Sequence, residues 1–389
     1  MTFQASLQAR DLANASARIA ALVDGRSTVP ILSNALLKVD DGRLTLASTN
    51  CDQSLIISVP AAGKGEITLS AARLAAAAAK LDPDQPVELA LTRSQVTIAQ
   101  GRAAWKLPTL SAGDYPQTLI DPVDGVEWLV ESAPLALRLN QVSGAAAVDK
   151  PGHSYLEGVY FDLGGEVPAL VACDINRLAL AEIADLAPPK AGNFILPLPA
   201  IRPIADLARS AARLTVRIGN GVVSFEGATE HTSERIRTRV IEGQYPDYGR
   251  IIPKSRAHRI AVDAATLGRV VGRAAVVEGD PIQSGRSKKR ITALRVDLGD
   301  EVLAISSRNS SGEEAADACE FQRLDGGSVT VGINANYLLW AADSFGEVDT
   351  LEIGIEDASG PILLTRASDT APEKAGAACA LRLVMPMRI

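Results

Sequence analysis

The side chains that most often perform catalysis or bind metals are few and widely spaced in this sequence. The three histidines, His153, His231 and His258, have no spacing that would place two of them on one metal ion. Residues 152–156 (GHSYL) begin like the turn that carries a nucleophilic serine, but they lack its second glycine. There is no phosphate-binding glycine loop and no HExxH motif. The sequence therefore favours a protein without a catalytic site.

The cysteines indicate a reducing compartment rather than a disulfide framework. Cys51, Cys173, Cys319 and Cys379 are far apart, and none forms a CxxC pair. No apolar run approaches the roughly 18–20 residues of a membrane span, and the N-terminus lacks the basic and apolar regions of a signal peptide. We therefore expect a cytoplasmic protein with no metal site and no cofactor.

Basic side chains gather on segments with helical spacing, although the whole chain is acidic, with a formal net charge of −7. Such groups would attract phosphate without reading base sequence, and solvated surface charge is the plainer interpretation. The last helical segment carries no base, which weakens the phosphate interpretation. The candidate phosphate contacts are Arg10, Arg18, Arg26, Arg73, Lys80, Arg138, Arg202, Arg209, Arg269 and Arg273.

The elements that carry these cations recur three times along the chain. The order of helix, hairpin, strand, helix and further strands is repeated, which indicates three copies of one unit. Asp41-Gly42 and Asn220-Gly221 stand between alternating apolar runs and predict hairpin turns. Apolar spacing predicts helices over residues 9–23, 70–81, 133–148, 199–211, 264–277 and 334–345.

A chain of 389 residues is too long for one ordinary core. The repeats predict an α+β protein of three domains, over residues 1–125, 126–256 and 257–389. Each domain is expected to have two helices packed on an antiparallel sheet.

The C-terminal residues suggest a binding surface. Met385 and Met387 are two of only three methionines, and the adaptable methionine side chain often lines peptide-binding surfaces. Residues 250–252 (RII) similarly place apolar side chains beside a turn. A terminal core strand is the alternative, and it suits Leu381 and Leu383 better than Met387.

Four segments resemble the bacterial DNA polymerase III β subunit, the sliding clamp: residues 29–34 (VPILSN), 173–178 (CDINRL), 245–253 (YPDYGRIIP) and 384–388 (VMPMR). The similarity covers all three repeats. It implies a head-to-tail ring of two subunits around duplex DNA, which tethers the replicative polymerase and has no catalytic activity. In such a ring the basic helix residues would face the DNA and contact its backbone phosphates.

The resemblance also implies two protein-binding surfaces. Short peptides of the polymerase α subunit, the clamp loader and other partners would dock between the second and third repeats. At the subunit interface, Trp105 and Leu107 on an edge strand would meet Val276 and Val277 of the partner subunit. The peptide groove would be lined by Leu156, Cys173, Arg177, Leu178, Pro246, Arg250, Ile251, Leu383, Met385, Pro386, Met387 and Arg388.

Two features depart from the family's pattern. Ile175-Asn176 stands where the family usually has Gly-His, and residues 366–378 are longer than the common pattern and are expected to protrude as a loop. These departures suggest a divergent clamp, and they fit a main clamp and a paralogue equally. Two other functions are compatible with the residues: a clamp-like scaffold that does not encircle DNA, and an α+β hydrolase that uses His153 or Ser154.

Overall fold

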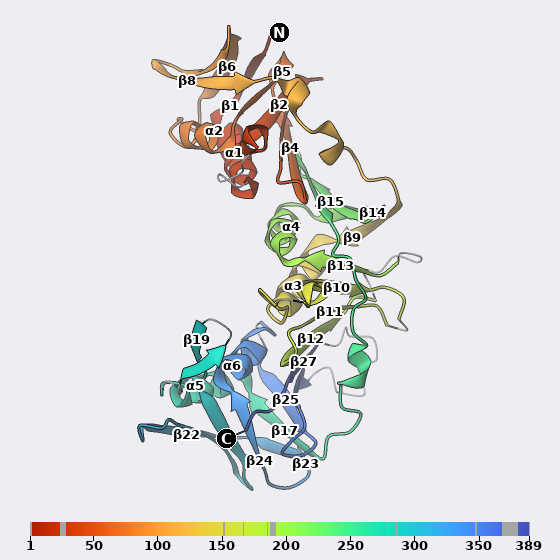
Figure 1. Ribbon diagram of the computed structural model, residues 1–389, viewed down its shortest axis with the longest axis vertical. Helices are drawn as coiled ribbons and strands as arrows, with labels where there is room; N and C mark the ends of the chain where they lie inside the picture. Colours follow the sequence, from red (N-terminus) through yellow and green to blue (C-terminus); the bar gives the residue numbers. More distant parts are fainter. Residues whose placement is uncertain are drawn as a thin grey trace. The chain divides into compact units, whose positions relative to one another are not determined.

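The computed structural model describes residues 2–23, 29–150, 152–165, 167–184, 186, 192–277, 279, 281–284, 287–346, 348–367 and 380–388 (Figure 1). Contacts divide the chain into two compact units, each made of two separate stretches. Unit 1 comprises Met1–Ala136 and Pro199–Val240, and unit 2 comprises Leu137–Leu198 and Ile241–Ile389. The middle repeat is therefore shared between the two units.

Six α-helices form in the described part of the chain, one at each predicted position. Ser70 caps the second helix by accepting the N–H of Arg73, and Asp263 caps the fifth by accepting the N–H of Thr266. The third helix stops short of the predicted residue 148 because Gly144, a poor helix former, follows its last turn. The helices are α1 (Ala9–Leu22), α2 (Ala71–Ala78), α3 (Ser132–Ser143), α4 (Leu198–Ser210), α5 (Ala264–Ala274) and α6 (Ala335–Asp343).

Unit 1 is built on one twelve-stranded antiparallel sheet in the order β1-β6-β7-β8-β5-β2-β3-β4-β16-β15-β14-β9. The first and second repeats meet at β4 and β16. Both predicted hairpin turns are confirmed, since Asp41-Gly42 and Asn220-Gly221 have positive φ at both residues, as a type I′ turn requires. The strands are β1 (Gln4–Gln8), β2 (Asn34–Asp40), β3 (Arg43–Thr49), β4 (Gln53–Pro60), β5 (Ala62–Ser70), β6 (Pro86–Thr92), β7 (Gln95–Gln100), β8 (Ala103–Leu110), β9 (Val126–Glu131), β14 (Arg213–Gly219), β15 (Val222–Ala228) and β16 (Ser233–Arg239).

Unit 2 contains a nine-stranded sheet in the order β13-β10-β11-β12-β27-β26-β25-β17-β23. The second and third repeats meet at β12 and β27, with Arg177 opposite Val384 and Ala181 opposite Ala380. The repeats are thus joined edge to edge by strand pairing, which the sequence did not predict. The strands are β10 (Gly158–Asp162), β11 (Ala169–Cys173), β12 (Arg177–Glu182), β13 (Phe194–Pro197), β17 (His258–Asp263), β23 (Gln322–Asp325), β25 (Thr350–Ile355), β26 (Ile362–Arg366) and β27 (Ala380–Val384).

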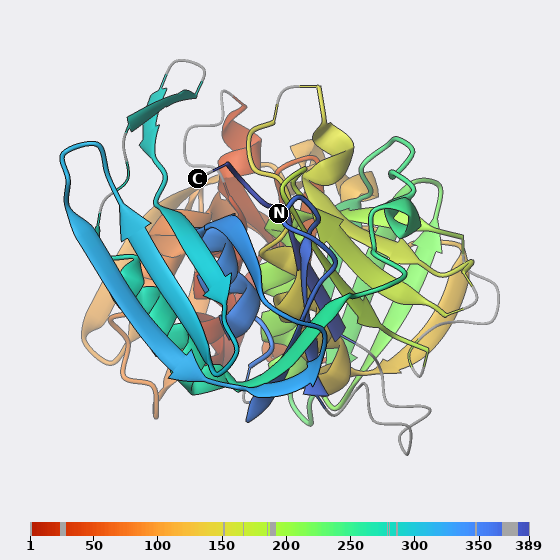
Figure 2. The ribbon, with the colours of Figure 1, turned by 90° about the horizontal axis from the view of Figure 1, so that it is seen from below.

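A four-stranded sheet, β22-β21-β20-β24, completes the third repeat, and α5 and α6 lie on one face of it (Figure 2). Leu294, Val296 and Ile305 point toward the helices and are buried, while their neighbours in the strands point to the other face. Its strands are β20 (Ala293–Leu298), β21 (Val302–Arg308), β22 (Glu314–Glu320) and β24 (Val329–Asn334), and a separate hairpin is formed by β18 (Pro281–Ser284) and β19 (Ser287–Arg290).

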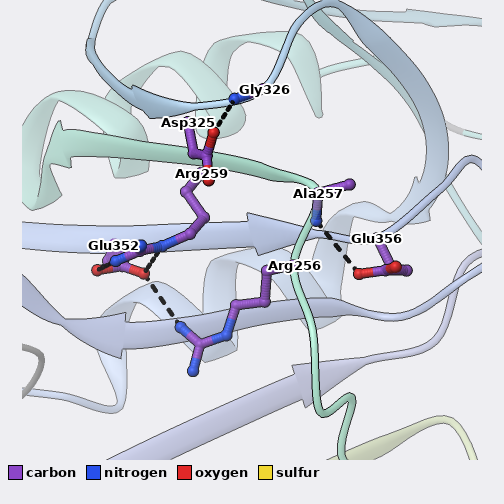
Figure 3. A network of polar contacts seen from close by, with 7 residues as sticks. All are labelled: Arg256, Ala257, Arg259, Asp325, Gly326, Glu352 and Glu356. Atoms are coloured by element: carbon purple, nitrogen blue, oxygen red, sulfur yellow. Dashed lines mark hydrogen bonds and ion pairs between the residues drawn. The ribbon is translucent and has the colours of Figure 1, made fainter.

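A buried carboxylate fixes the start of the third repeat to its sheet (Figure 3). Glu352 on β25 is only 1% exposed and accepts from Arg256 at 3.1 Å and from Arg259 at 2.9 Å. The backbone N–H of Ala257 donates to Glu356 at 3.2 Å. Paired charges of this kind tolerate burial because each compensates the other's lost hydration. The segment that enters the third repeat is therefore held against β25.

Candidate functional site

An apolar cluster lies where β12 and β27 pair, at the junction of the second and third repeats. Five sequence-predicted groove residues belong to it: Leu156, Cys173, Leu178 and Leu383 are buried, and Met385 packs against them. Tyr245 joins this junction cluster from the 245–253 segment, and its hydroxyl donates to the Cys173 sulfur at 3.4 Å. Burial raises the pKa of both the Cys173 thiol and the Tyr245 hydroxyl, so both remain neutral.

A tight turn joins the junction cluster to α6. The Asp174 carboxylate accepts the backbone N–H groups of Asn176 and Arg177, at 3.1 and 3.2 Å, and it also pairs with the Arg177 guanidinium at 2.9 Å. That guanidinium lies over the rings of Tyr337 and Trp340, 4.9 and 4.7 Å from their centroids. Arg177 is therefore held in one position rather than extended into solvent.

Within this turn, Ile175 has a φ of 83° and a side chain that is 59% exposed. Positive φ is rare for a β-branched residue because its Cβ crowds the backbone. An apolar side chain is thus presented beside the junction cluster at a cost in backbone strain.

The tail after β27 runs from the junction cluster to β24. The N–H of Met385 donates to the carbonyl of Asn176 at 2.7 Å, and the N–H of Met387 donates to the carbonyl of Gly332 at 2.9 Å. Met385, Pro386 and Met387 are half-buried and Arg388 is exposed. Arg388 does not lie in the junction cluster; it borders a separate hollow on the four-stranded sheet.

The 245–253 segment contributes both buried and exposed side chains. Tyr248 begins a short 3-10 helix (Tyr248–Arg250) and donates to the Asp162 carboxylate at 2.7 Å. Pro246 and Ile251 are exposed, and Arg250 is 83% exposed beside Asp247, to which it donates at 2.8 Å. These three predicted groove residues therefore remain accessible to a ligand.

The predicted DNA-facing cations differ in their exposure and in whether they pair with an acidic side chain. Arg18 and Arg138 are half-buried, and Arg18 pairs with the buried carboxylate of Glu234 at 2.6 Å. Arg26 lies outside the described residues. Arg10, Arg209 and Arg273 are exposed but each pairs with an acid, namely Asp84, Asp206 and Asp317. The remaining exposed cations are Arg73, Lys80, Arg202 and Arg269.

Three of the four predicted interface residues have accessible side chains. Trp105 and Leu107 on β8 are half-buried, and in the described part of the chain β8 pairs with β5 only through Thr109 and Leu110. Val276, which follows α5, is 77% exposed.

Val277 is different, because it is only 9% exposed. A charge placed there would disturb folding as well as assembly. Val276 is therefore the better position at which to test the interface.

Neither a metal site nor a hydrolytic dyad forms among the described residues. No group of three or more His, Cys, Asp or Glu side chains there is arranged to hold a metal. His153 hydrogen-bonds Tyr155, at 2.8 Å, in place of Ser154. Cys51, Cys173 and Cys319 are free thiols. Over the same residues, no helix combines the length and apolar character needed to cross a membrane.

Comparison with known families accounts for nearly the whole chain. Models of the N-terminal, central and C-terminal domains of the DNA polymerase III beta subunit match residues 1–120, 130–247 and 249–378. The beta sliding clamp of Caulobacter vibrioides is 30% identical over 372 residues, which cover 91% of this chain and 93% of that protein. The beta sliding clamp of Vibrio cholerae is 23% identical and covers 96% of both chains.

Solved structures share the fold over the full length. The sliding clamp of Pseudomonas aeruginosa bound to griselimycin superposes with a TM-score of 0.86 at 24% identity and covers 100% of both chains. The beta sliding clamp of Caulobacter crescentus, with PEG bound to a putative beta-motif tethering region, has a TM-score of 0.86 at 26% identity and covers 100% of this chain and 99% of that chain.

Proposed function

Because the chain belongs to the DNA polymerase III beta subunit family, we propose that it acts as a sliding clamp, a non-catalytic ring that encircles duplex DNA and tethers the replicative polymerase. The observation that carries this function is the match of all three clamp domains, in order, on a fold of six helices and antiparallel sheets. The protein works in the cytoplasm, where replication takes place. Domain limits at residues 125/126 and 256/257 are part of the proposal.

The ring forms from two copies joined head to tail. On each copy, β8 offers an incompletely paired edge near Trp105 and Leu107. In the described residues β22 pairs only with β21, so its other edge is also available. Pairing the edge of one subunit with the edge of the next would remove both exposed edges. Val276 supplies an exposed apolar side chain near this contact.

The helix cations contact DNA through phosphate. Four of these cations are exposed and form no ion pair with a carboxylate among the described residues: Arg73, Lys80, Arg202 and Arg269. They therefore supply most of the attraction to DNA. Phosphate contacts are independent of base sequence, which suits a protein that slides. Arg18, whose side chain is directed to Glu234, contributes less.

The junction cluster with its exposed neighbours forms the docking site for partner peptides. Met385, Pro386, Ile251 and Pro246 supply accessible apolar surface at a preformed cluster, and Arg250 supplies an exposed donor. Apolar anchors in a preformed slot, oriented by few polar groups, are typical of peptide recognition. Partners are the polymerase α subunit, the clamp loader and other proteins that carry such peptides.

A processivity assay tests this function. DNA polymerase III core and clamp loader from the same bacterium should make much longer products on primed circular DNA when this chain is added. Arg250→Ala should shorten the products and also slow loading, because the polymerase and the clamp loader dock at the same peptide site. Protein that has already been loaded should stay on the DNA as the unmodified protein does, because the DNA contacts are separate residues. A chain that binds polymerase but does not lengthen the products would be a scaffold, and the proposal would be wrong.

A further inference from the structure

A hollow of about 730 Å³ lies on the outward face of the four-stranded sheet in the third repeat. Its floor consists of small side chains, Ala293, Ser306 and Ala316, on three neighbouring strands. These residues alternate with the buried ones that face α5, so the hollow and the helices lie on opposite faces. The small floor residues leave room that larger side chains would fill.

Three guanidinium groups surround this hollow, which we call the arginine hollow. Arg295 comes from β20, Arg308 from β21, and Arg388 from the C-terminal tail. Arg295 donates to Asp297 at 2.8 Å, and Arg308 donates to Glu314 at 3.0 Å. Among the described residues, three positive groups and two carboxylates leave about one uncompensated positive charge, and Arg388 is the residue that supplies it.

The C-terminal tail leads from the peptide site to the arginine hollow. The tail leaves the junction cluster at Met385 and reaches β24 at Met387, whose N–H donates to Gly332. Gly332 lies directly opposite Arg295 in the sheet. Three residues of extended chain span about 10 Å. A linear peptide anchored at Met385 therefore needs only three or four more residues to reach the arginines.

We propose that the arginine hollow is a second subsite for partner peptides and that it binds one carboxylate, from an Asp or Glu side chain or from a chain terminus, three to four residues from the apolar anchors. This inference rests on the proposed function, because it extends the same docking site. A single net positive charge suits one carboxylate, whereas a nucleic-acid backbone would present several phosphates. The alanine floor accommodates the aliphatic part of the acidic side chain.

The test compares two peptides on the full-length protein. The probe is a fluorescein-labelled copy of the C-terminal tail of the polymerase III α subunit from the same bacterium, with Glu or Gln placed three or four residues from its apolar anchors on either side. Binding is followed by anisotropy at about 50 mM and about 500 mM salt. In one of the placements, we expect the Glu peptide to bind about three- to tenfold more tightly than the Gln peptide at low salt. The ratio of the two affinities should be smaller at high salt.

Arginine variants test whether the hollow is the cause of the tighter binding of the Glu peptide. Arg295→Gln and Arg388→Gln should bring the Glu-to-Gln ratio close to one, while Arg239→Gln, an exposed arginine of unit 1, should leave the ratio as in the unmodified protein. Thermal unfolding of each variant checks that the fold is intact. Arg388 has no acidic partner among the described residues, whereas Arg295 pairs with Asp297, so the Arg388→Gln variant gives the cleaner result.

Three results would overturn the inference. Equal affinity for Glu and Gln peptides in every placement would remove the subsite and leave the proposed function intact. No binding of either peptide would refute the docking site itself, and the subsite with it. The third result combines equal affinity of the unmodified protein for the two peptides with weaker binding of a single-stranded oligonucleotide by the Arg295→Gln and Arg388→Gln variants than by the unmodified protein. That result would assign the hollow to nucleic acid instead.

Discussion

The environment of Glu234 predicts that unit 1 loses stability as the pH rises through neutrality. Glu234 lies on β16 with a side chain only 7% exposed, between α1 and α4. Burial raises its pKa to about 7 from 4.5, because the lost hydration outweighs the attraction of Arg18, and Asp206 adds to the rise. The folded state therefore holds a proton more tightly than the unfolded chain does.

The sign and size of the effect follow from this difference. Between pH 4.5 and 7 the folded state binds more protons than the unfolded state, so stability falls as the pH rises and levels off above pH 7. A pKa difference of about 2.5 units, at about 1.4 kcal/mol per unit, predicts a loss of about 2 to 3 kcal/mol between pH 5 and pH 8. The stabilising contribution is present at acidic pH and is lost at neutral pH.

Urea unfolding at intervals between pH 5 and pH 8 measures this contribution. Glu234→Gln cannot ionise, so its stability should change with pH by about 2 to 3 kcal/mol less than that of the unmodified protein. Glu131→Gln, which removes an exposed carboxylate paired with Arg213, should follow the unmodified protein. Parallel pH profiles for Glu234→Gln and the unmodified protein would refute the reasoning, and a steeper loss at acidic pH in the unmodified protein would mean that the Arg18 ion pair dominates.

Three further substitutions test other parts of the structure. Val276→Asp should fold normally but weaken dimerisation by at least about 100-fold in sedimentation experiments, because it places an unpaired charge in an apolar contact. Val148→Asp, which alters another exposed valine, is the control. A stable Val276→Asp dimer would contradict the assigned interface. Arg382→Ala should cost about 3 to 5 kcal/mol in urea unfolding, because the buried guanidinium donates to Ser344 and to the Leu180 carbonyl, and each buried acceptor left without a donor costs about 1 to 3 kcal/mol. A cost below about 1 kcal/mol would show that these bonds contribute little. Ile175→Gly should leave the melting temperature unchanged or higher, because relief of about 1 to 2 kcal/mol of backbone strain offsets the larger conformational entropy that glycine loses on folding. The same change should weaken peptide binding, and unchanged peptide binding would exclude Ile175 from the site.

Local signals in the sequence predicted the elements well. The six helices and the two hairpin turns were found because apolar spacing, caps and Asp-Gly or Asn-Gly pairs are short-range features. The strand β22 was not predicted, since its sequence EAADACE is rich in residues with low strand propensity. The pairing of β4 with β16 and of β12 with β27 was also missed, because no local pattern specifies a partner so distant in sequence.

The candidate site was predicted only in part. Its apolar members came from the family resemblance, and the structure groups five of them in the junction cluster. The stacking of Arg177 on α6, the strain at Ile175 and the pairing of Arg18 with Glu234 depend on tertiary contacts that spacing does not show. Part of the predicted loop at 366–378, from residue 368 onward, lies outside the described residues.

Retention on circular and linear DNA tests the ring most directly. The labelled protein is loaded by the clamp loader onto a nicked plasmid, isolated by gel filtration, and the plasmid is then cut at one site. A closed ring should stay on the circle at high salt and leave after the cut, and protein blocks on both DNA ends should prevent this loss. Equal retention on circular and cut DNA without blocks, or salt-dependent loss from both, would contradict a protein that encircles its DNA.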